Sequence, residues 1–505
     1  MQYGFVIDQR RCIGCHACTV ACKSENDVPL GDFRTWVKYA EVGEFPQVRR
    51  HFAVLRCNQC TDAPCVTICP VEALEKRPDG IVDLDKDVCI GCKACMQACP
   101  YDALYLNDET GGAEKCHFCA HRVEMGLKPA CEIVCPEEAI ISGDFHDPQS
   151  KVSVLKREVA GATARRTDQG TGPNVFYLGA HDTLLEPGTA QEPSTYIWSD
   201  RRSPPPPMPE ADKPRFQRPD ARVVLDVDHK LHWGEKVSAY LVTKGIAAGA
   251  CMWAPFVAAM QSTDGARAYA PEILGLLFTT LTTILLVADL KRPAKFLSLL
   301  LRPNWRSWLV KGAIVLIAYS TITAAIVGAR LFGFDAVADA LRWVNVLPAS
   351  MAAAYTAFLF AQCEGRDLWQ RTSVLLPHLL VQALWAGGLA LLPFVPDTGL
   401  AAAVALLGVI HHGLGLFERY SRHHTSNAQQ AAAMLAAVKA WKGSRYSALH
   451  LGLATGTAAT LVALLLLLGG APSAAALSAC AVLGWTGLFF YEQAYIRAGQ
   501  LPPLS

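Results

Sequence analysis

Sixteen of the 19 cysteines in this 505-residue chain lie between Cys12 and Cys135. They fall into four groups of four, and each group opens with two cysteines that are separated by two other residues. The groups are Cys12, Cys15, Cys18 and Cys22; Cys57, Cys60, Cys65 and Cys69; Cys89, Cys92, Cys95 and Cys99; and Cys116, Cys119, Cys131 and Cys135. Only Cys251, Cys363 and Cys480 follow, so thiol chemistry is confined to the beginning of the chain.

The first and third groups have the C-x2-C-x2-C-x3-C spacing of bacterial ferredoxins, and Pro100 completes the motif in the third. This spacing lets three thiolates on one tight loop reach one iron–sulfur cubane, while the fourth points away toward a second cluster. Gly14 and Gly91 permit the tight turn inside each loop. Sixteen cysteines therefore predict four [4Fe–4S] clusters.

Three other roles for these cysteines are less consistent with the pattern. Structural zinc also uses C-x2-C pairs, but repeated ferredoxin spacing with trailing Pro70, Pro100 and Pro136 favours iron–sulfur clusters. Disulfides need an oxidising compartment, and we expect no secretory signal, because no apolar run follows the first residues or Arg10-Arg11. The stretch from Cys12 to His16 matches a haem-attachment motif, but it lies inside a complete cysteine quartet.

The rest of the chain is apolar enough to predict a membrane domain. Hydrophobic residues make up 51% of the sequence, charged residues only 18%, and mean hydropathy is +0.21. Eight apolar stretches approach the roughly 20 residues that a helix needs to cross a bilayer. A soluble buried bundle is the alternative, but runs such as LVALLLLLGG disfavour it. The stretches are 237–260, 273–290, 312–330, 347–363, 375–394, 398–416, 449–469 and 474–496.

Basic residues are concentrated in alternate connections between these stretches. By the positive-inside rule, the richer loops, both termini and the cysteine-rich part are expected to be cytoplasmic. The alternative is that the basic loops dock an acidic partner. The opposite loops offer only Arg267, Arg330 and Arg342. The richer side carries Lys230, Lys236, Lys291, Arg292, Lys295, Arg302, Arg306, Lys311, Arg366, Arg371, Arg419, Arg422, Lys439, Lys442, Arg445 and Arg497.

A polar, proline-rich stretch separates the two parts and includes Pro204 to Pro207. Consecutive prolines favour an extended spacer, so we divide the chain into a head (1–182), a linker (183–230) and a membrane domain (231–505). The formal net charge of +1 argues against a nucleic-acid partner.

The four cysteine groups, with the stretch GTGPNVFYL, resemble the four-cluster electron-transfer subunits of molybdopterin oxidoreductases of the dimethyl-sulfoxide-reductase type. The resemblance implies an α+β ferredoxin-like head built of two double-cluster modules. It implies four cubanes, since Cys92 and Cys95 are both present where some relatives have tryptophan. The implied ligand sets are Cys12, Cys15, Cys18 and Cys135; Cys22, Cys116, Cys119 and Cys131; Cys57, Cys60, Cys65 and Cys99; and Cys69, Cys89, Cys92 and Cys95.

The membrane part resembles the polysulfide-reductase or NrfD-type anchors, through motifs such as HWGEKVSAYLVTKGIAAGA and AYTAFLFAQCEGRDLW. These anchors are quinone-reactive proteins of eight helices without haem. The resemblance therefore implies an all-α polytopic bundle of about eight transmembrane helices that follows the head.

Ionisable residues within apolar runs are costly, so they are the candidates for quinone and proton chemistry. Our candidates for the quinone site are Glu235, Lys244, Asp289, Tyr355 and His378, and Tyr355 is the nearest match to a pocket tyrosine of the relatives. Alternatives stay open: Asp289 pairs with Arg292 at the interface, Lys244 extends toward the headgroups, or histidines on several helices bind haem b. Further polar candidates are His411, His412, His450 and Glu492.

These features together predict an electron-transfer and anchor subunit of a quinone-linked oxidoreductase in a bacterial inner membrane, with a cytoplasmic head. The expected partners are a large molybdopterin-containing catalytic subunit, membrane lipid and a quinone, ubiquinone or menaquinone, and a higher-order oligomer is compatible with them. The substrate-converting site is expected on another chain. The alternatives are a proton-pumping anchor and an iron–sulfur redox sensor without a catalytic partner.

Overall fold

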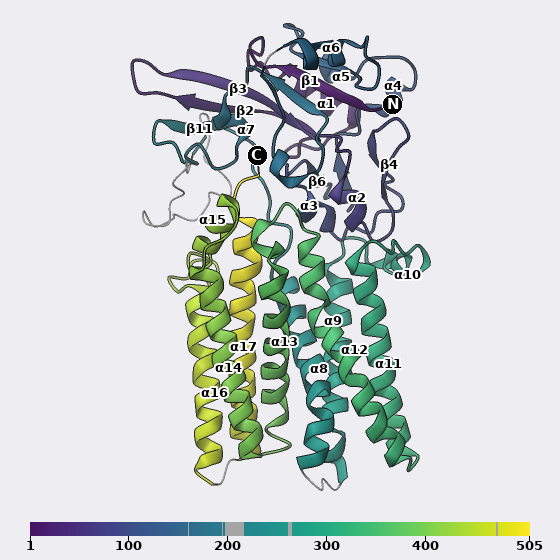
Figure 1. Cartoon of the computed structure of the whole chain (residues 1–505), viewed down its shortest axis with the longest axis vertical. Coiled ribbons are helices and arrows are strands. Elements are labelled where there is room, and N and C mark those ends of the chain that lie inside the picture. The colour runs from purple at the N-terminus through teal and green to yellow at the C-terminus, as the bar shows by residue number, and fades with distance from the viewer. Residues whose placement is uncertain (160, 194, 197–216, 261–264, 471–472, 505) are drawn as a thin grey trace.

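The computed structural model consists of a head stacked on a long helical bundle, with both chain ends on the head side of the bundle (Figure 1). It describes residues 1–159, 161–193, 195–196, 217–260, 265–470 and 473–504. Pro204 to Pro207 of the predicted linker lie outside the described residues.

Two sheets give the head its frame. In the first, the strand order is β8-β1-β10-β9, and the central strand β1 runs parallel to β10 and antiparallel to β8. These strands are β1 (Tyr3–Asp8), β8 (Ile140–Asp144), β9 (Ala162–Thr163) and β10 (Val175–Leu178). The second sheet is antiparallel, in the order β11-β2-β3, with β2 (Thr35–Val42), β3 (Arg49–Arg56) and β11 (Ala221–Leu225).

Two short ribbons and several short helices surround the cysteines. The ribbons pair β4 (Leu74–Lys76) with β5 (Val82–Leu84) and β6 (Leu104–Leu106) with β7 (Ala113–Lys115). This mixture of small antiparallel ribbons and one-turn helices confirms the predicted α+β ferredoxin-like head. The helices are α1 (Ala17–Asn26), α2 (Pro64–Ile68), α3 (Ala94–Ala98), α4 (Ala120–Val123), α5 (Ala130–Ile133), α6 (Lys151–Glu158) and α7 (Asp182–Leu185).

The end of the predicted linker is part of the head. Residues 221–225 form β11, which pairs with β2 from Ala221 opposite Val42 to Leu225 opposite Tyr39. Alternating apolar residues in ARVVL bury Ala221 and Val223 against the head. The predicted linker (183–230) therefore does not hold for residues 221–225, which are part of the head.

Eight helices are long and apolar enough to cross a membrane among the described residues, which confirms the predicted number. They are α8 (Glu235–Met260), α9 (Ala270–Asp289), α11 (Trp308–Leu331), α12 (Asp335–Ala361), α13 (Thr372–Leu391), α14 (Thr398–Tyr420), α16 (Ala448–Leu468) and α17 (Ala474–Gln500). Short elements lie in the head-side connections: η4 (Pro293–Lys295), α10 (Ser298–Leu301), η5 (Asp367–Gln370) and α15 (Ser426–Met434).

Helix α12 begins at Asp335 rather than near residue 347. Its first turns carry Arg342, whose guanidinium binds both carboxylate oxygens of Glu272 on α9, at 2.6 and 3.1 Å. Both side chains are buried, because each neutralises the other. Arg342, and Arg330 at the end of α11, are therefore helical residues rather than loop residues.

The bundle has two groups of four helices that meet where α8 crosses α13 (Figure 1). The first group is α8, α9, α11 and α12, and the second is α13, α14, α16 and α17. Gly249 and Gly387 permit this crossing: a Cβ on Gly249 would lie 1.8 Å from the Ala383 carbonyl oxygen. Small residues let helix backbones approach closely within a membrane. As a result, the two groups form one continuous bundle below the head.

Candidate functional site

The four Cys-x2-Cys loops share one backbone turn. In each, the residue before the second cysteine has a positive φ: 70° at Gly14, 48° at Gln59, 69° at Gly91 and 61° at Phe118. Glycine adopts this conformation freely, whereas an L side chain pays roughly 1–2 kcal/mol. Gln59 and Phe118 therefore maintain the turn at a conformational cost, which indicates that the loop geometry itself is needed.

The ends of the last three groups also share a local structure. Cys69, Cys99 and Cys135 are each followed by proline, and the third residue after each cysteine has a positive φ. Proline has no N–H to donate, and backbone amides two to five residues after each cysteine donate to its sulfur. The Ala139 amide, for example, donates to Cys135 Sγ at 3.2 Å. Such donors stabilise a charged sulfur at each of these positions.

The fold brings the sixteen cysteines together in four sets, each drawn from two groups. Within each set the sulfurs lie close enough to interact as charges, and one set lines a single cavity in the head. The interacting sets are Cys12, Cys15, Cys18 and Cys135; Cys22, Cys116, Cys119 and Cys131; Cys57, Cys60, Cys65 and Cys99; and Cys69, Cys89, Cys92 and Cys95.

The four sets form a row through the head. Neighbouring sets interact through Cys18 with Cys131, Cys57 with Cys116, and Cys65 with Cys95. Cys15, in the set at one end, is exposed. At the other end, the Cys92 carbonyl accepts a hydrogen bond from Trp233 Nε1, just before α8, at 3.4 Å. The row therefore leads from the surface of the head to the top of the membrane bundle.

The buried sulfurs fit iron–sulfur clusters. Burial raises the pKa of Cys18 and of Cys119 to about 11, so their thiolates need a cationic partner at neutral pH. In a [4Fe–4S] cluster, the four cysteine ligands bind separate irons, and each iron is the cationic partner of one thiolate.

Three cations beside the cysteines were missed by the sequence analysis. Arg56 is fully buried, and its Nη1 donates to Cys131 Sγ at 3.1 Å. Burial opposes the charge of Arg56, but the thiolates of Cys131 and its neighbours outweigh burial and raise the Arg56 pKa. Lys115 is also buried and donates to the Cys116 carbonyl, and Lys93 follows Cys92. Each cation is adjacent in sequence to a cysteine, which is the signal that could have identified it.

Asp289, a predicted quinone-site residue, lies at the seam between head and bundle. Its carboxylate pairs with Lys93 of the head at 2.8 Å, rather than with Arg292. Arg292 instead donates to the carbonyls of Thr110 and Cys89 in the head. The seam is therefore a polar interface built around the third cysteine group.

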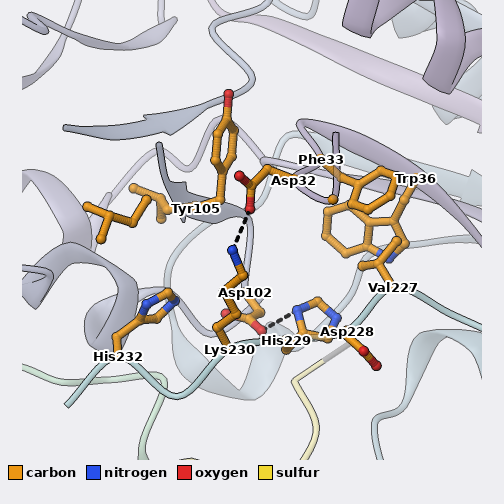
Figure 2. A pocket seen from close by; sticks show the side chains of 13 residues that line it. Asp32, Phe33, Trp36, Asp102, Tyr105, Val227, Asp228, His229, Lys230 and His232 are labelled. Carbon is orange, nitrogen blue, oxygen red and sulfur yellow. Dashed lines mark hydrogen bonds and ion pairs between the residues drawn. The ribbon is translucent and has the colours of Figure 1, made fainter. Parts of the chain in front are cut away.

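A small pocket occupies the same seam, between the head and the segment that leads into α8 (Figure 2). His229 forms an ion pair with Asp102, and Lys230 pairs with Asp32 at 3.3 Å. Burial opposes ionisation of both partners of the first pair. Their mutual attraction prevails, so the pKa of Asp102 is held well below its usual value and that of His229 is raised. The first pair attaches the segment before α8 to the third cysteine group, and the second attaches it to the loop before β2.

Lys244 and Tyr355 are brought together inside the bundle. Lys244 Nζ lies 4.6 Å from the Tyr355 ring centroid and donates to the Ala353 carbonyl at 3.0 Å and to Thr356 Oγ1. Both side chains are buried, on the head-proximal parts of α8 and α12. They form a compact polar cluster among otherwise apolar helices.

The other two quinone-site candidates lie apart from this cluster. Glu235 is exposed and pairs with Arg497 at 3.1 Å, so it belongs to the surface. His378 lies on α13 in a buried group with His411 and Glu418 of α14 and Tyr491 of α17; Tyr491 donates to Glu418 at 2.6 Å. His378 therefore faces the second group of helices.

Glu492 on α17 lies between the two polar clusters. It accepts a hydrogen bond from Gln382 at 2.6 Å and interacts electrostatically with both Lys244 and His378. The His378 and His411 rings contact each other directly, Nε2 to Nδ1, at 2.9 Å. That distance leaves no room for an iron between them, so this pair is not an axial haem pair.

Comparison with known proteins matches both parts of the chain. Residues 48–145 match the 4Fe-4S dicluster domain family, and residues 224–401 match the family "Polysulphide reductase, NrfD".

The individual relatives each match about a third of the chain. One tetrathionate reductase subunit, from Salmonella typhimurium, is 45% identical over 195 residues, which are 38% of this chain and 78% of that protein. The thiosulfate reductase electron transfer subunit PhsB of Salmonella typhi is 44% identical over 161 residues, 31% of this chain and 84% of that protein. One of the polysulfide reductase proteins of Wolinella succinogenes is 40% identical over 181 residues, 35% of this chain and 94% of that protein.

Proposed function

Because this chain belongs to the iron–sulfur electron-transfer subunits of reductase complexes and also carries an NrfD-type membrane domain, we propose that it connects a separate catalytic subunit with membrane quinone. The catalytic subunit would carry a molybdopterin cofactor with molybdenum or tungsten. The observation that supports this proposal best is the row of cysteine sets, which ends at the membrane bundle.

The proposed ligands are the four cysteine sets, each holding one [4Fe–4S] cluster. When bound, the clusters supply one-electron carriers between a two-electron catalytic site and the quinone. The repeated loop turns and the amides that donate to sulfur, such as Ala139 to Cys135, support this assignment.

The catalytic subunit is proposed to dock over the exposed end of the row, at Cys15. Apolar side chains are exposed there next to the cysteines in sequence: Ile13 at 56%, Ile133 at 55% and Val134 at 40%. Apolar side chains that are exposed together are typical of a protein interface.

Quinone is proposed to bind beside Lys244 and Tyr355, below the membrane-facing end of the row. Lys244 offers an N–H donor for a quinone carbonyl, and Tyr355 offers a hydroxyl and an aromatic face. Glu492, which interacts electrostatically with Lys244, would exchange protons with the quinone oxygens together with it. The pair of Asp289 with Lys93 supports the site from the interface between head and bundle. His378 contributes through the neighbouring group of polar side chains, by its electrostatic interaction with Glu492.

The head is proposed to face the cytoplasm of a bacterial inner membrane. The excess of basic residues in the head-side loops has a second cause in part, because Lys291, Arg292 and Arg366 bind the head directly. The orientation therefore rests on the remaining basic residues. They include Arg419, Arg422, Lys439, Lys442 and Arg445 in the connection between α14 and α16.

The test is purification of the tagged chain from solubilised membranes, with partners identified and iron, molybdenum and tungsten quantified. We expect a large partner chain with molybdenum or tungsten, and about sixteen irons per copy of this chain, as four cubanes require. A chain that purifies alone with its iron, and that reduces or oxidises no quinone, would overturn the proposal.

A further inference from the structure

Arg56 is a buried arginine at the junction of β3 and the second cysteine group. It ends the strand, directly before Cys57, and its relative exposure is 0%. Its side chain lines the cavity that is also lined by Cys22, Cys116, Cys119 and Cys131. A guanidinium is therefore buried at the wall of a proposed cluster site.

Most N–H donors of the Arg56 guanidinium have no hydrogen-bond partner in the described part of the head. Nη1 donates to Cys131 Sγ at 3.1 Å, and the Phe5 ring covers the guanidinium, with 4.4 Å between its central carbon and the ring centroid. Nε and Nη2 have no hydrogen-bond partner among the described residues. Buried donors are almost always satisfied in folded proteins. The sulfides of a cluster in this cavity are acceptors that would satisfy them.

Other buried arginines of the head are neutralised or engaged elsewhere. Arg34 pairs with the Glu114 carboxylate at 2.7 Å, and Arg165 donates to the Leu504 carbonyl at 2.7 Å. Arg56 has neither kind of partner within the residues that the structure describes. The charges that surround it are the sulfurs of Cys131, Cys116 and Cys18. Its positive charge is therefore balanced by cluster ligands.

We propose that Arg56 is a positioning residue that raises the midpoint potential of the cluster held by Cys22, Cys116, Cys119 and Cys131, the second in the row. This inference rests on the proposed function. Reduction of that site takes one electron from a neighbouring centre and adds one negative charge, with no proton. A fixed cation at hydrogen-bond distance from a ligand sulfur, with no carboxylate to neutralise it, stabilises the reduced state more than the oxidised state.

The test is a redox titration of the purified complex followed by electron paramagnetic resonance. In Arg56→Gln we expect the reduced-to-oxidised ratio of one cluster, at a fixed potential, to fall at least about tenfold, which is 59 mV for a one-electron couple. Arg56→Lys keeps the charge and is expected to shift the potential less. Arg165→Gln is the matched control, a fully buried arginine without a sulfur contact, and should leave all four potentials unchanged.

A second measurement needs no variant. In the native complex labelled with 15N only in arginine guanidinium groups, pulsed resonance should detect nitrogen coupled to one reduced cluster. Unchanged potentials in Arg56→Gln, equal shifts of all four clusters, or no coupling in the labelled complex would each overturn the role of Arg56. Loss of the catalytic partner or of the clusters from the native complex would instead overturn the proposed function, so the two failures are distinguishable.

Discussion

Lys244 is the buried cation that the proposed quinone site depends on most. Its ammonium has no carboxylate within hydrogen-bond distance among the described residues and is held by the Ala353 carbonyl, Thr356 and the face of Tyr355. We predict that Lys244→Met lowers quinone-linked turnover at least about tenfold, because the quinone loses a donor and a proton source. Electron transfer from a soluble dye through the head to the catalytic partner should stay at the native rate.

The matched control is Lys236, eight positions earlier on the same helix, which donates to the Ala288 carbonyl at the surface. Lys236→Met should retain quinone-linked turnover. Equal losses in both variants, or loss of dye-linked transfer in Lys244→Met, would mean that Lys244 has a structural role instead.

The ion pair of His229 with Asp102 predicts a pH-dependent attachment of head to bundle. Asp102 raises the pKa of His229 despite burial, and Asp226 adds to this effect whereas Lys38 opposes it. A raised histidine pKa adds stability that is complete below the ordinary value of about 6.5 and is lost as pH rises through the folded value. The lowered pKa of Asp102 means that the stability contributed by its carboxylate is lost only in strong acid.

We therefore expect the purified chain to lose stability between about pH 6.5 and the raised pKa of His229, by roughly 1.5–3 kcal/mol, the usual worth of a charged hydrogen bond. Thermal unfolding in detergent at several pH values measures this loss. His229→Gln should remove the pH-dependent part, whereas substitution of the exposed His146 by Gln should preserve it. A native pH profile in His229→Gln contradicts the assignment.

At the scale of single elements, the sequence predicted the cysteine loops and the membrane helices because both depend on local patterns. Spacing fixes a loop of few residues, and apolar length fixes a membrane helix. The start of α12 and the place of β11 depend instead on contacts between distant residues, Arg342 with Glu272 and Val223 with Ala40. Contacts between distant residues leave no local pattern in the sequence. The ion pairs of Glu235 and Asp289 are also of this kind, so the sequence alone could not distinguish these two quinone candidates from Lys244.

Helices α8 and α13 are predicted to depend on glycine at their crossing. Gly249→Ala places a methyl group 1.8 Å from the Ala383 carbonyl oxygen, so the helices must separate, at a cost of about 1–3 kcal/mol or more. Gly245, one turn earlier, is the control, since its added Cβ would meet nothing closer than 3.8 Å. Thermal unfolding in detergent should show a loss for Gly249→Ala and none for Gly245→Ala. A larger loss of stability in Gly245→Ala than in Gly249→Ala would contradict the close approach of the two helices at Gly249.

The pair of α9 with α12 is predicted to be essential for stability of the first helix group. Arg342→Met leaves Glu272 buried without its partner, which costs about 3–5 kcal/mol. Arg330→Gln removes a pair with the exposed Asp339 and a contact with the Tyr269 ring at 6.0 Å, each worth about 0–1 kcal/mol. The midpoint of thermal unfolding in detergent compares them. Equal midpoints would show that the buried pair contributes nothing.

At the scale of the whole molecule, the head and the bundle are joined by contacts that also align the row of cysteine sets with the proposed quinone site. Gln97 in the third group binds Gln500 of α17 at 2.9 Å, and Arg166 contacts Asp367 between α12 and α13 at 3.4 Å. These contacts tie α12, α13 and α17 to the head at once. Because head and bundle belong to one chain, the distance between the row of cysteine sets and the proposed quinone site is fixed. Two separate subunits would have to associate in one defined position to reach the same distance.

The orientation of this assembly is the last property that the loops predict. If the head is cytoplasmic, a protease site inserted at Gly333, between α11 and α12, faces the periplasm, and one inserted at Gly443, between α15 and α16, faces the cytoplasm. Both positions are exposed, and they lie at opposite ends of the bundle. Protease added to intact spheroplasts should cut only the Gly333 insertion, and protease added to inverted vesicles only the Gly443 insertion. The reverse pattern would place the head outside, and the basic residues of the Gly443 loop would then have to be explained by docking rather than by membrane insertion.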